Sequence, residues 1–240
     1  MPQRKWAWLL FWVWLTACSD KYSHQATRLP LDKRLSLIQT HLLLGQFSLA
    51  KQELERIKEA DQLREYWRLS SLYWLTLKDF EMAEKVSKEG LKRYPMDAFL
   101  LNNYGVLLGT KKHWKEACEL FQQAEQVALL PRQSVQINLS RCALRQEDVN
   151  LAKKHIVRAK EIADLPVIGL LTELNLVLIQ GNNDKARIIF NNIQAQANIA
   201  LGWAHFNEFT CLSKYINRHE DDAAQYSYAS DFTCLNGSRY

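Results

Sequence analysis

The most closely grouped ionisable side chains in this sequence are His219, Glu220, Asp221 and Asp222, in the turn before the predicted last helix. Imidazole and carboxylate groups at this spacing can bind a divalent metal ion. Acidic residues at a helix start also stabilise the helix dipole without any ligand, and we interpret the cluster in this way. The sequence has no nucleotide-binding, zinc-protease, nucleophile-elbow or Cys-x-x-Cys motif. It therefore predicts a protein that is not an enzyme and has no metal and no cofactor.

The charge of the chain gives no reason to expect a nucleic acid partner. The formal net charge is +5 over 240 residues, whereas nucleic acid binding usually needs a concentrated basic face. Two helical stretches carry several cations each, namely Lys85, Lys88, Lys92 and Arg93, and Lys153, Lys154, Arg158 and Lys160. We interpret both as solvated helix surfaces. The alternative is an electrostatic contact with phospholipid head groups or with an acidic partner.

Cys18 is the residue for which the sequence predicts a defined chemical modification. Arg4 and Lys5 precede an apolar run at residues 6–15, which is too short to span a bilayer and is typical of a secretory signal. The run ends in Leu-Thr-Ala-Cys and resembles the lipobox of bacterial lipoproteins. That resemblance implies cleavage before Cys18 and attachment of lipid to its thiol. The alternative is a plain signal peptide beside an incidental cysteine.

The resemblance also predicts where the chain resides. Ser19 stands where an Asp would favour retention in the inner membrane, so it favours the outer membrane, with the folded part on the periplasmic face. Residues 19–30 are polar and fit a tether between lipid and folded body. We therefore expect a signal peptide at 1–17, a lipidated Cys18 and tether at 18–30, and a folded domain at 31–240.

Four other cysteines remain, Cys118, Cys142, Cys211 and Cys234. An even number in an oxidising compartment is compatible with disulfides, and four cysteines allow three pairings. The pairs 118–142 and 211–234 each join neighbouring predicted helices. Buried free thiols are the alternative, and we favour this alternative for Cys118 and Cys142.

A small residue early in every second helix recurs at a nearly constant interval. These residues are Ala50, Ala83, Ala117, Ala152, Ala186, and then Ala223 or Ala224. The intervals are 33, 34, 35, 34, and 37 or 38 residues, which match the 34-residue tetratricopeptide repeat. The sequence therefore predicts an all-α solenoid of about six helical hairpins in a right-handed superhelix.

The clearest repeat lies at residues 101–124. Gly105, Ala117 and Phe121 fit the tetratricopeptide pattern directly, while Leu101, Tyr104 and Leu108 replace its Trp, Leu and Tyr. Small residues are expected where the two helices of a hairpin approach each other closely, and large ones where they fill the space between helices.

A solenoid of this kind presents a groove lined by its first helices, which suits an extended or helical peptide. On the repeat frame, the groove residues are Arg68, Leu72, Leu75, Asn102, Asn103, Val106, Gly109, Ile137, Arg141, Leu144, Leu171, Asn175 and Leu178. The alternative for several of them is packing between repeats, because a register error of one residue rotates a helix face by about 100°.

The whole chain resembles the type IV pilus biogenesis and stability lipoproteins, the PilF/PilW-like pilotins. The resemblance rests on Asn102-Asn103-Tyr104-Gly105, on Trp114-Lys115-Glu116-Ala117 with Phe121, and on Asn138-Leu139-Ser140 with Ala152-Lys153. Ser140 stands where Gly is usual in that family, and the last repeat lacks its closing Pro.

This resemblance implies a monomeric, non-enzymatic outer-membrane lipoprotein that helps the pilus secretin subunit to localise, multimerise and remain stable. It leaves open whether the client is a pilus secretin or a secretion-system secretin. Two other classes are compatible with the sequence. One is a different periplasmic tetratricopeptide scaffold lipoprotein, serving outer-membrane protein assembly or cell-wall enzymes. The other is an enzyme whose site no motif reveals.

Overall fold

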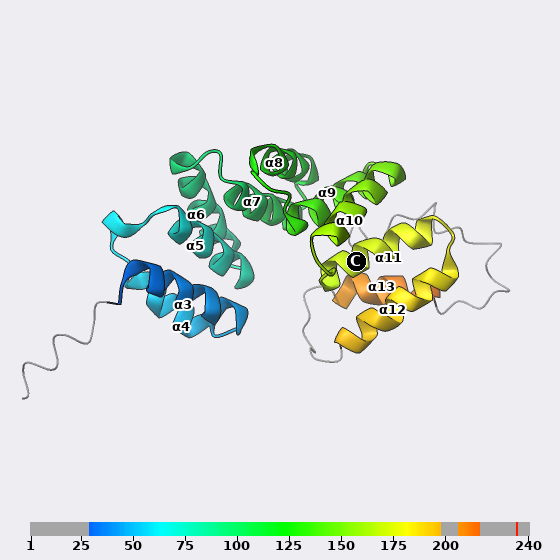
Figure 1. The fold of residues 1–240 in the computed structure, drawn as a ribbon, viewed down its shortest axis with the longest axis horizontal. Helices are drawn as coiled ribbons and strands as arrows, with labels where there is room; N and C mark the ends of the chain where they lie inside the picture. The colour runs from blue at the N-terminus through cyan, green and yellow to red at the C-terminus, as the bar shows by residue number, and fades with distance from the viewer. Residues whose placement is uncertain (1–28, 198–205, 217–233, 235–240) are drawn as a thin grey trace, which may run out of the picture. The chain divides into compact units, whose positions relative to one another are not determined.

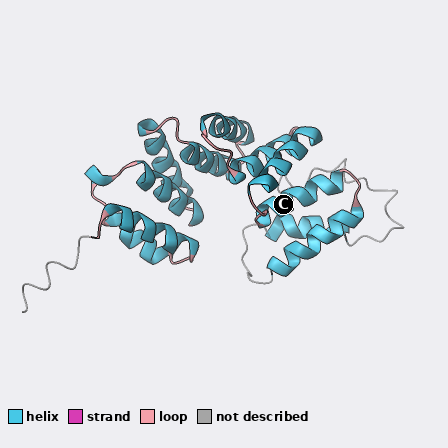
Figure 2. Cartoon of the chain, in the orientation of Figure 1, coloured by secondary structure: helices cyan, strands magenta, loops and turns pink. Residues whose placement is uncertain are grey.

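Helices form all the regular structure in the described part of the chain (Figure 1, Figure 2). The computed structural model describes residues 29–197, 206–216 and 234. Cys18, the predicted signal peptide, the acidic cluster at residues 219–222 and Ala223 or Ala224 lie outside these residues. No described helix is both long and apolar enough to cross a membrane. The predicted all-α fold is confirmed for the described residues.

The helices follow one another as pairs. The first helices are α3 (Leu31–Leu43), α5 (Arg64–Thr76), α7 (Ala98–Thr110), α9 (Gln133–Arg145) and α11 (Val167–Ile179). The second helices are α4 (Phe47–Glu55), α6 (Phe80–Arg93), α8 (Trp114–Val127), α10 (Val149–Ile162) and α12 (Asn183–Ala197). A 3₁₀ helix, η1 (Glu59–Asp61), precedes α5, and α13 (Phe206–Ile216) follows α12 as the first helix of a sixth pair. The second helix predicted for that pair falls among residues that are not described.

The five described repeat alanines confirm the 34-residue count. Ala50, Ala83, Ala117, Ala152 and Ala186 all lie on second helices, and each is at most 1% exposed. A larger side chain at any of these positions would push the paired helices apart, because interiors are close-packed.

The turn inside each pair has the same backbone form. Gly45, Lys78, Lys112, Glu147 and Gly181 all have a φ between 59° and 71°, the left-handed conformation that commonly ends a helix. Their intervals are 33, 34, 35 and 34 residues, identical to those of the alanines. Three of the five are not glycine, so the turn repeats in structure without repeating in sequence.

The described chain divides into two compact units after Leu69. In the first unit, α3 packs against α4, with Ile38 and Ala50 fully buried. The carboxylate of the buried Glu53 pairs with the guanidinium of Arg34. This pairing satisfies a charge that would be costly to bury alone.

In the second unit, each helix from α6 to α12 packs against the next one in the chain. One apolar cluster surrounds Phe121 at the contacts of α7, α8 and α9, and a second surrounds Leu174 from α9 to α13. Phe209 of α13 joins the second cluster, where its ring stacks on Phe190 with centroids 4.8 Å apart. Helix α9 contributes residues to both clusters, and it therefore connects the core of the earlier repeats to that of the later ones.

Close helix approach explains the two glycines of α7. A Cβ atom on Gly105 would lie 2.6 Å from the Phe121 ring, and one on Gly109 would lie 2.7 Å from the Trp114 ring. The guanidinium of Arg145 lies over the Trp114 ring, 3.4 Å from the ring centroid. The predicted role of Gly105 as a close-approach residue is confirmed. Gly109 has the same role and does not line a groove.

Both cysteine pairs that the sequence leaves open are disulfides. Cys118 of α8 is bonded to Cys142 of α9, and Cys211 of α13 is bonded to Cys234. The preference for free thiols at Cys118 and Cys142 was wrong. Burial alone did not distinguish the two forms, because both sulfurs lie in the apolar cluster around Phe121.

Candidate partner-binding surface

The first helices of the second unit lie side by side, with α7 in contact with α9, α9 with α11, and α11 with α13 (Figure 1). This row of helices is where the sequence places its groove. The structure divides the predicted groove residues into three groups: accessible apolar residues, paired polar residues and buried residues.

The accessible apolar group consists of Leu72, Leu75 and Val106. Leu72 is 40% exposed, and the other two are half-buried. Leu72 and Leu75 lie in the part of α5 that belongs to the second unit, and Val106 lies on α7. These residues are available to an apolar side chain of a partner.

The asparagines of α7 link neighbouring first helices. Asn103 Nδ2 donates to Ser71 Oγ at 2.9 Å, and Asn138 Nδ2 of α9 donates to Asn102 Oδ1 at the same distance. Asn102 accepts through its oxygen in this bond and also carries two N–H donors, because an asparagine side chain offers both kinds of group. Both asparagines are half-buried.

Arg141 is held by a carboxylate from 67 residues further along the chain. Its Nη1 and Nη2 donate to Glu208 Oε1 and Oε2 at 3.0 and 2.9 Å, and Nη1 also lies 3.3 Å from Thr172 Oγ1. Asn175 Nδ2 donates to Glu208 Oε1 at 3.1 Å. We call Arg141, Thr172, Asn175 and Glu208 the C-terminal ladder, since it joins α9, α11 and α13.

The structure buries six residues that the sequence predicts in the groove, namely Gly109 and five others. Ile137, Leu144, Leu171, Asn175 and Leu178 have exposed fractions of 2, 0, 0, 0 and 6%. They pack between helices, so they do not form an open floor. The three on α11 are buried because this helix is covered on all sides: every residue from Gly169 to Leu178 is buried. Ile137 and Leu144 of α9 belong to the apolar cluster around Leu174.

Arg68 belongs to the first unit, where its Nη1 pairs with Glu65 Oε2 at 2.9 Å. It is half-buried. Among the described residues, the accessible part of the predicted groove in the second unit is therefore its N-terminal portion, on α5 and α7.

Several solved structures share this arrangement of helices. PilF of Pseudomonas aeruginosa matches with a TM-score of 0.57 and 20% identity, over 84% of this chain and 96% of PilF. PilW, described as a widely conserved type IV pilus biogenesis factor, matches with a TM-score of 0.60 and 15% identity, over 83% and 96%. TTC0263, a tetratricopeptide repeat protein of Thermus thermophilus, matches with a TM-score of 0.59 and 18% identity, over 78% and 99%. The chain has the tetratricopeptide repeat fold.

No family model and no curated protein matches the sequence. The tetratricopeptide assignment therefore rests on the helical pairs, the repeat interval and the structural likeness together. Proteins of this fold use the surface of their stacked helices to bind other proteins.

Three members of the C-terminal ladder follow the interval of the tetratricopeptide repeat. Arg141, Asn175 and Glu208 occupy equivalent slots of successive first helices, because they are 34 and 33 residues apart. Glu208 is missing from the predicted groove, although the repeat interval places it in the same position of its helix as Asn175. Thr172 and Asn138 each follow a predicted groove residue by one position, so the repeat interval did not point to them.

Burial and neighbouring charges shift the pKa of two ionisable groups in the second unit, Arg145 and Glu84. Burial and the positive charge of Arg141 lower the pKa of Arg145 to about 9, against the opposing effect of Glu208. Hydrogen bonds from Lys111 and Lys88 lower the pKa of Glu84 to about 2. Both groups are therefore charged at neutral pH.

His155 of α10 is the buried imidazole of the described residues. Its Nδ1 lies 2.8 Å from Gln136 Oε1, and Gln136 Nε2 donates to Glu125 Oε1 at 2.9 Å. Because Oε1 of Gln136 is an acceptor, Nδ1 carries the proton. Burial is the main cause that lowers the pKa of His155.

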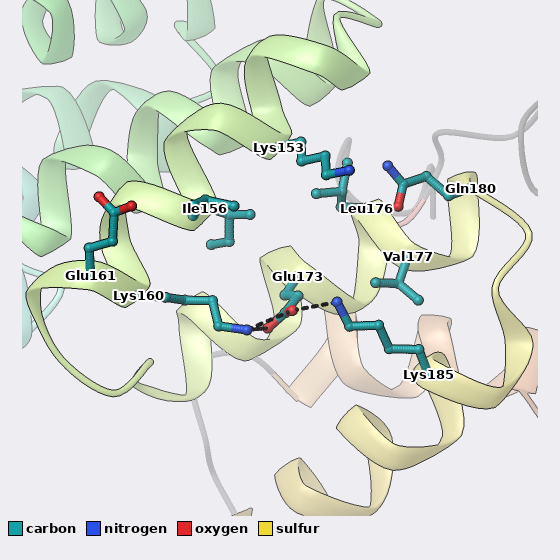
Figure 3. Close-up of a pocket in the computed structure, with 10 residues that line it drawn as sticks. Lys153, Ile156, Lys160, Glu161, Glu173, Leu176, Val177, Gln180 and Lys185 are labelled. Atoms are coloured by element: carbon teal, nitrogen blue, oxygen red, sulfur yellow. Dashed lines mark hydrogen bonds and ion pairs between the residues drawn. The ribbon is translucent and has the colours of Figure 1, made fainter.

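One hollow of the tetratricopeptide solenoid is lined by none of the predicted groove residues. It has a volume of about 310 Å³ and is enclosed by α10, α11 and α12 (Figure 3). Its lining includes Lys153, Lys160, Lys185 and the buried Glu173. No group of three or more His, Cys, Asp or Glu side chains that could hold a metal occurs in the described residues.

Proposed function

We propose that this chain is an outer-membrane lipoprotein, a pilotin, which assists the localisation, multimerisation and stability of the type IV pilus secretin by binding it. The protein carries out no catalysis in this role. Its lipid anchor is on Cys18, and the tetratricopeptide domain works in the periplasm.

The observation that carries the proposal is the extent of the likeness to PilF and PilW. The match covers 96% of each of these proteins and more than four fifths of this chain. The chain therefore has room for the whole of the fold that they share. The lipobox at Cys18 adds the export and anchoring that a periplasmic partner of an outer-membrane channel requires.

The two disulfides support the proposed compartment. Disulfides persist in the bacterial periplasm and are rare in the reducing cytosol. The pairs 118–142 and 211–234 account for all the cysteines other than Cys18. A single thiol then remains for lipid attachment.

The surface proposed to contact the secretin is the accessible part of the predicted groove. Leu72, Leu75 and Val106 provide apolar contacts, and Asn102 and Asn103 provide amides. Such a surface can bind a peptide segment through side-chain pockets and hydrogen bonds to the peptide backbone.

The test is deletion of the gene followed by detection of heat-resistant secretin multimers in outer-membrane fractions. We expect the multimers and twitching motility to be lost, and to be restored by the wild-type gene. A Cys18→Ala variant should lack the lipid and should restore neither at the wild-type level. Normal multimers and normal twitching in the deletion strain would refute the pilotin function.

A second candidate is a periplasmic tetratricopeptide scaffold that serves outer-membrane protein assembly or cell-wall enzymes. The fold is compatible with it, because TTC0263, which is described only as a tetratricopeptide repeat protein, is as similar in structure as PilF and PilW are. In that case the deletion would leave secretin multimers intact and would alter the abundance of other outer-membrane proteins or the cross-linking of the cell wall.

A further inference from the structure

The hollow between α10, α11 and α12 has the features of a second binding site. It lies between two second helices, α10 and α12, and α11 forms its floor (Figure 3). It shares no residue with the proposed groove on α5 and α7. Its volume of about 310 Å³ is at the lower end of the range for ligand pockets and fits a few side chains.

Four residues of α10 form a single stripe along one wall. Lys153, Ile156, Val157 and Lys160 follow the i, i+3, i+4, i+7 spacing of one helix face. The lysines are two turns apart, about 10.5 Å along the axis. The wall therefore has a cation at each end and apolar side chains between them, and the carboxylate of Glu161 also borders the hollow next to Lys160.

A buried carboxylate fixes the cations at one end. Glu173 is 7% exposed at its side chain, and its Oε1 lies 3.0 Å from both Lys160 Nζ and Lys185 Nζ. Figure 3 shows the two ammonium groups meeting at this carboxylate from opposite sides. Both lysine side chains remain about half exposed. Since an ammonium group has three donors, each of them can also bind an external anion.

The other end has a cation without such a counterion. Lys153 is exposed and makes no ion pair with the described part of the chain. Gln180 is exposed beside it (Figure 3), and its amide can both donate to and accept from a peptide backbone. Leu176 and Val177, which are 3 and 2% exposed, form the floor between the two ends.

We propose that this hollow binds an extended acidic segment of a partner protein, with an apolar side chain on the floor and a carboxylate at each end. In an extended chain, alternate residues face the same side. A Glu-x-Leu-x-Glu segment therefore directs all three side chains into the site. Its two glutamates are about 13 Å apart at the backbone, a span that flexible lysine side chains can bridge.

A peptide suits the hollow better than a lipid surface does. The apolar floor is recessed between the cations, whereas the head groups of a bilayer form a layer that would meet protruding cations. The site also alternates charged and apolar positions at a spacing that matches a polypeptide. Anionic lipid is nevertheless included in the test as the competing ligand.

The experiment uses the purified full-length chain and the fluorescein-labelled peptide Glu-Ser-Leu-Ser-Glu, with binding followed by fluorescence anisotropy. Two matched peptides replace the central Leu by Ser or both Glu by Gln. We expect each replacement to weaken binding at least tenfold, and we expect binding to weaken as salt is raised.

Charge reversal locates the site. Lys153→Glu should weaken binding at least tenfold, while Lys154→Glu should change it less than twofold. Lys154 is the exposed neighbour on the same helix and is not part of the lining, so the two variants have equal net charge. Circular dichroism should show both variants to be as helical as the wild type.

Three results would overturn the proposal. One is equal binding of the Glu and Gln peptides, another is equal weakening by the two lysine variants, and the third is Lys153-dependent binding to phosphatidylglycerol vesicles with no binding to the peptide. The test uses no secretin, so its outcome does not depend on the pilotin function.

Discussion

Arg141 of α9 and Glu208 of α13 form a bidentate ion pair that is largely withdrawn from solvent, with side chains 13 and 10% exposed. Arginine is suited to this geometry because its planar guanidinium matches the two oxygens of a carboxylate. The pair lies where the sequence predicted a ligand contact. Arg141 is thus used to hold the fold together at the C-terminal end of the predicted groove.

Arg141→Ala should destabilise the protein by about 3 kcal/mol, because it leaves the carboxylate of Glu208 buried without its partner. The double variant Arg141→Met/Glu208→Leu should lie within about 1 kcal/mol of the wild type, since no charge is then left unpaired. Chemical denaturation followed by circular dichroism measures both. A double variant as unstable as the single one would show that the single variant is not destabilised by an unpaired charge on Glu208.

Replacing Cys118 and Cys142 together by alanine should lower the free energy of unfolding by about 3 kcal/mol, as expected for a cross-link across 24 residues. Thermal unfolding with and without reductant measures the effect. In the variant, reductant should lower the melting temperature less than it does in the wild type, because only the 211–234 disulfide is left to reduce.

The matched control is the pair Cys211 and Cys234, which spans 23 residues. Removing this disulfide should lower the free energy of unfolding by a similar amount, because the two bonds close loops of nearly equal length. A much smaller effect at either pair would indicate that the unfolded chain keeps that region compact.

Gly105→Ala should cost about 1–3 kcal/mol, although alanine favours helices, because the added methyl group would overlap the ring of the buried Phe121. Gly105→Ala/Phe121→Leu should recover part of the loss, beyond the sum of the single effects. Denaturation of the four proteins of this cycle provides the measurement. Strict additivity would contradict a direct clash.

Much of the fold could be predicted from the sequence because the spacing of the alanines alone reveals the length and number of the repeats. Every helix pair needs one small residue at its closest approach, so composition and spacing reveal it. The left-handed turns could not be predicted at Lys78, Lys112 and Glu147, since these residue types seldom adopt a positive φ. The structure imposes that conformation through the hydrogen bonds that close each helix.

The site was less predictable because a groove depends on rotation about each helix axis. Leu72 and Ile137 are both apolar residues of first helices, yet one is 40% exposed and the other 2%. The difference comes from the neighbouring helices, which no single repeat encodes. The pairing of Arg141 with Glu208 likewise depends on two residues 67 positions apart.

The stability of the protein should fall as the pH drops below about 6.5, the ordinary value for histidine. The pKa of His155 is lowered in the folded state, so the unfolded state binds the proton more tightly and gains from acidification. This contribution is fully present above pH 6.5 and declines below it.

Melting temperatures between pH 5 and 8 measure this dependence. His155→Gln should show a shallower decline than the wild type, while the matched variant His113→Gln, at an exposed position, should follow the wild type. Equal slopes for the two variants would exclude His155 as the source.

Leu72→Asp should reduce the recovery of secretin with the protein roughly fivefold, corresponding to the loss of about 1 kcal/mol at an interface residue. Leu77→Asp is the matched control, since Leu77 is 39% exposed against 40% for Leu72 and lies beyond the end of α5. Co-purification from outer-membrane extracts measures the difference. Equal losses in the two variants would show that Leu72 is not part of the surface that binds the secretin.

The C-terminal ladder has a consequence for how the solenoid unfolds. In an ordinary repeat array each unit contacts only its neighbours, so the ends can fray one repeat at a time. Arg141 reaches past the fifth helix pair to Glu208 on α13, a contact between next-nearest repeats. Detachment of α13 would therefore leave Arg141 on α9 without the carboxylate of Glu208. The helices from α9 to α13 should melt in one cooperative step, and amide hydrogen exchange across α9, α11 and α13 should report a single opening free energy.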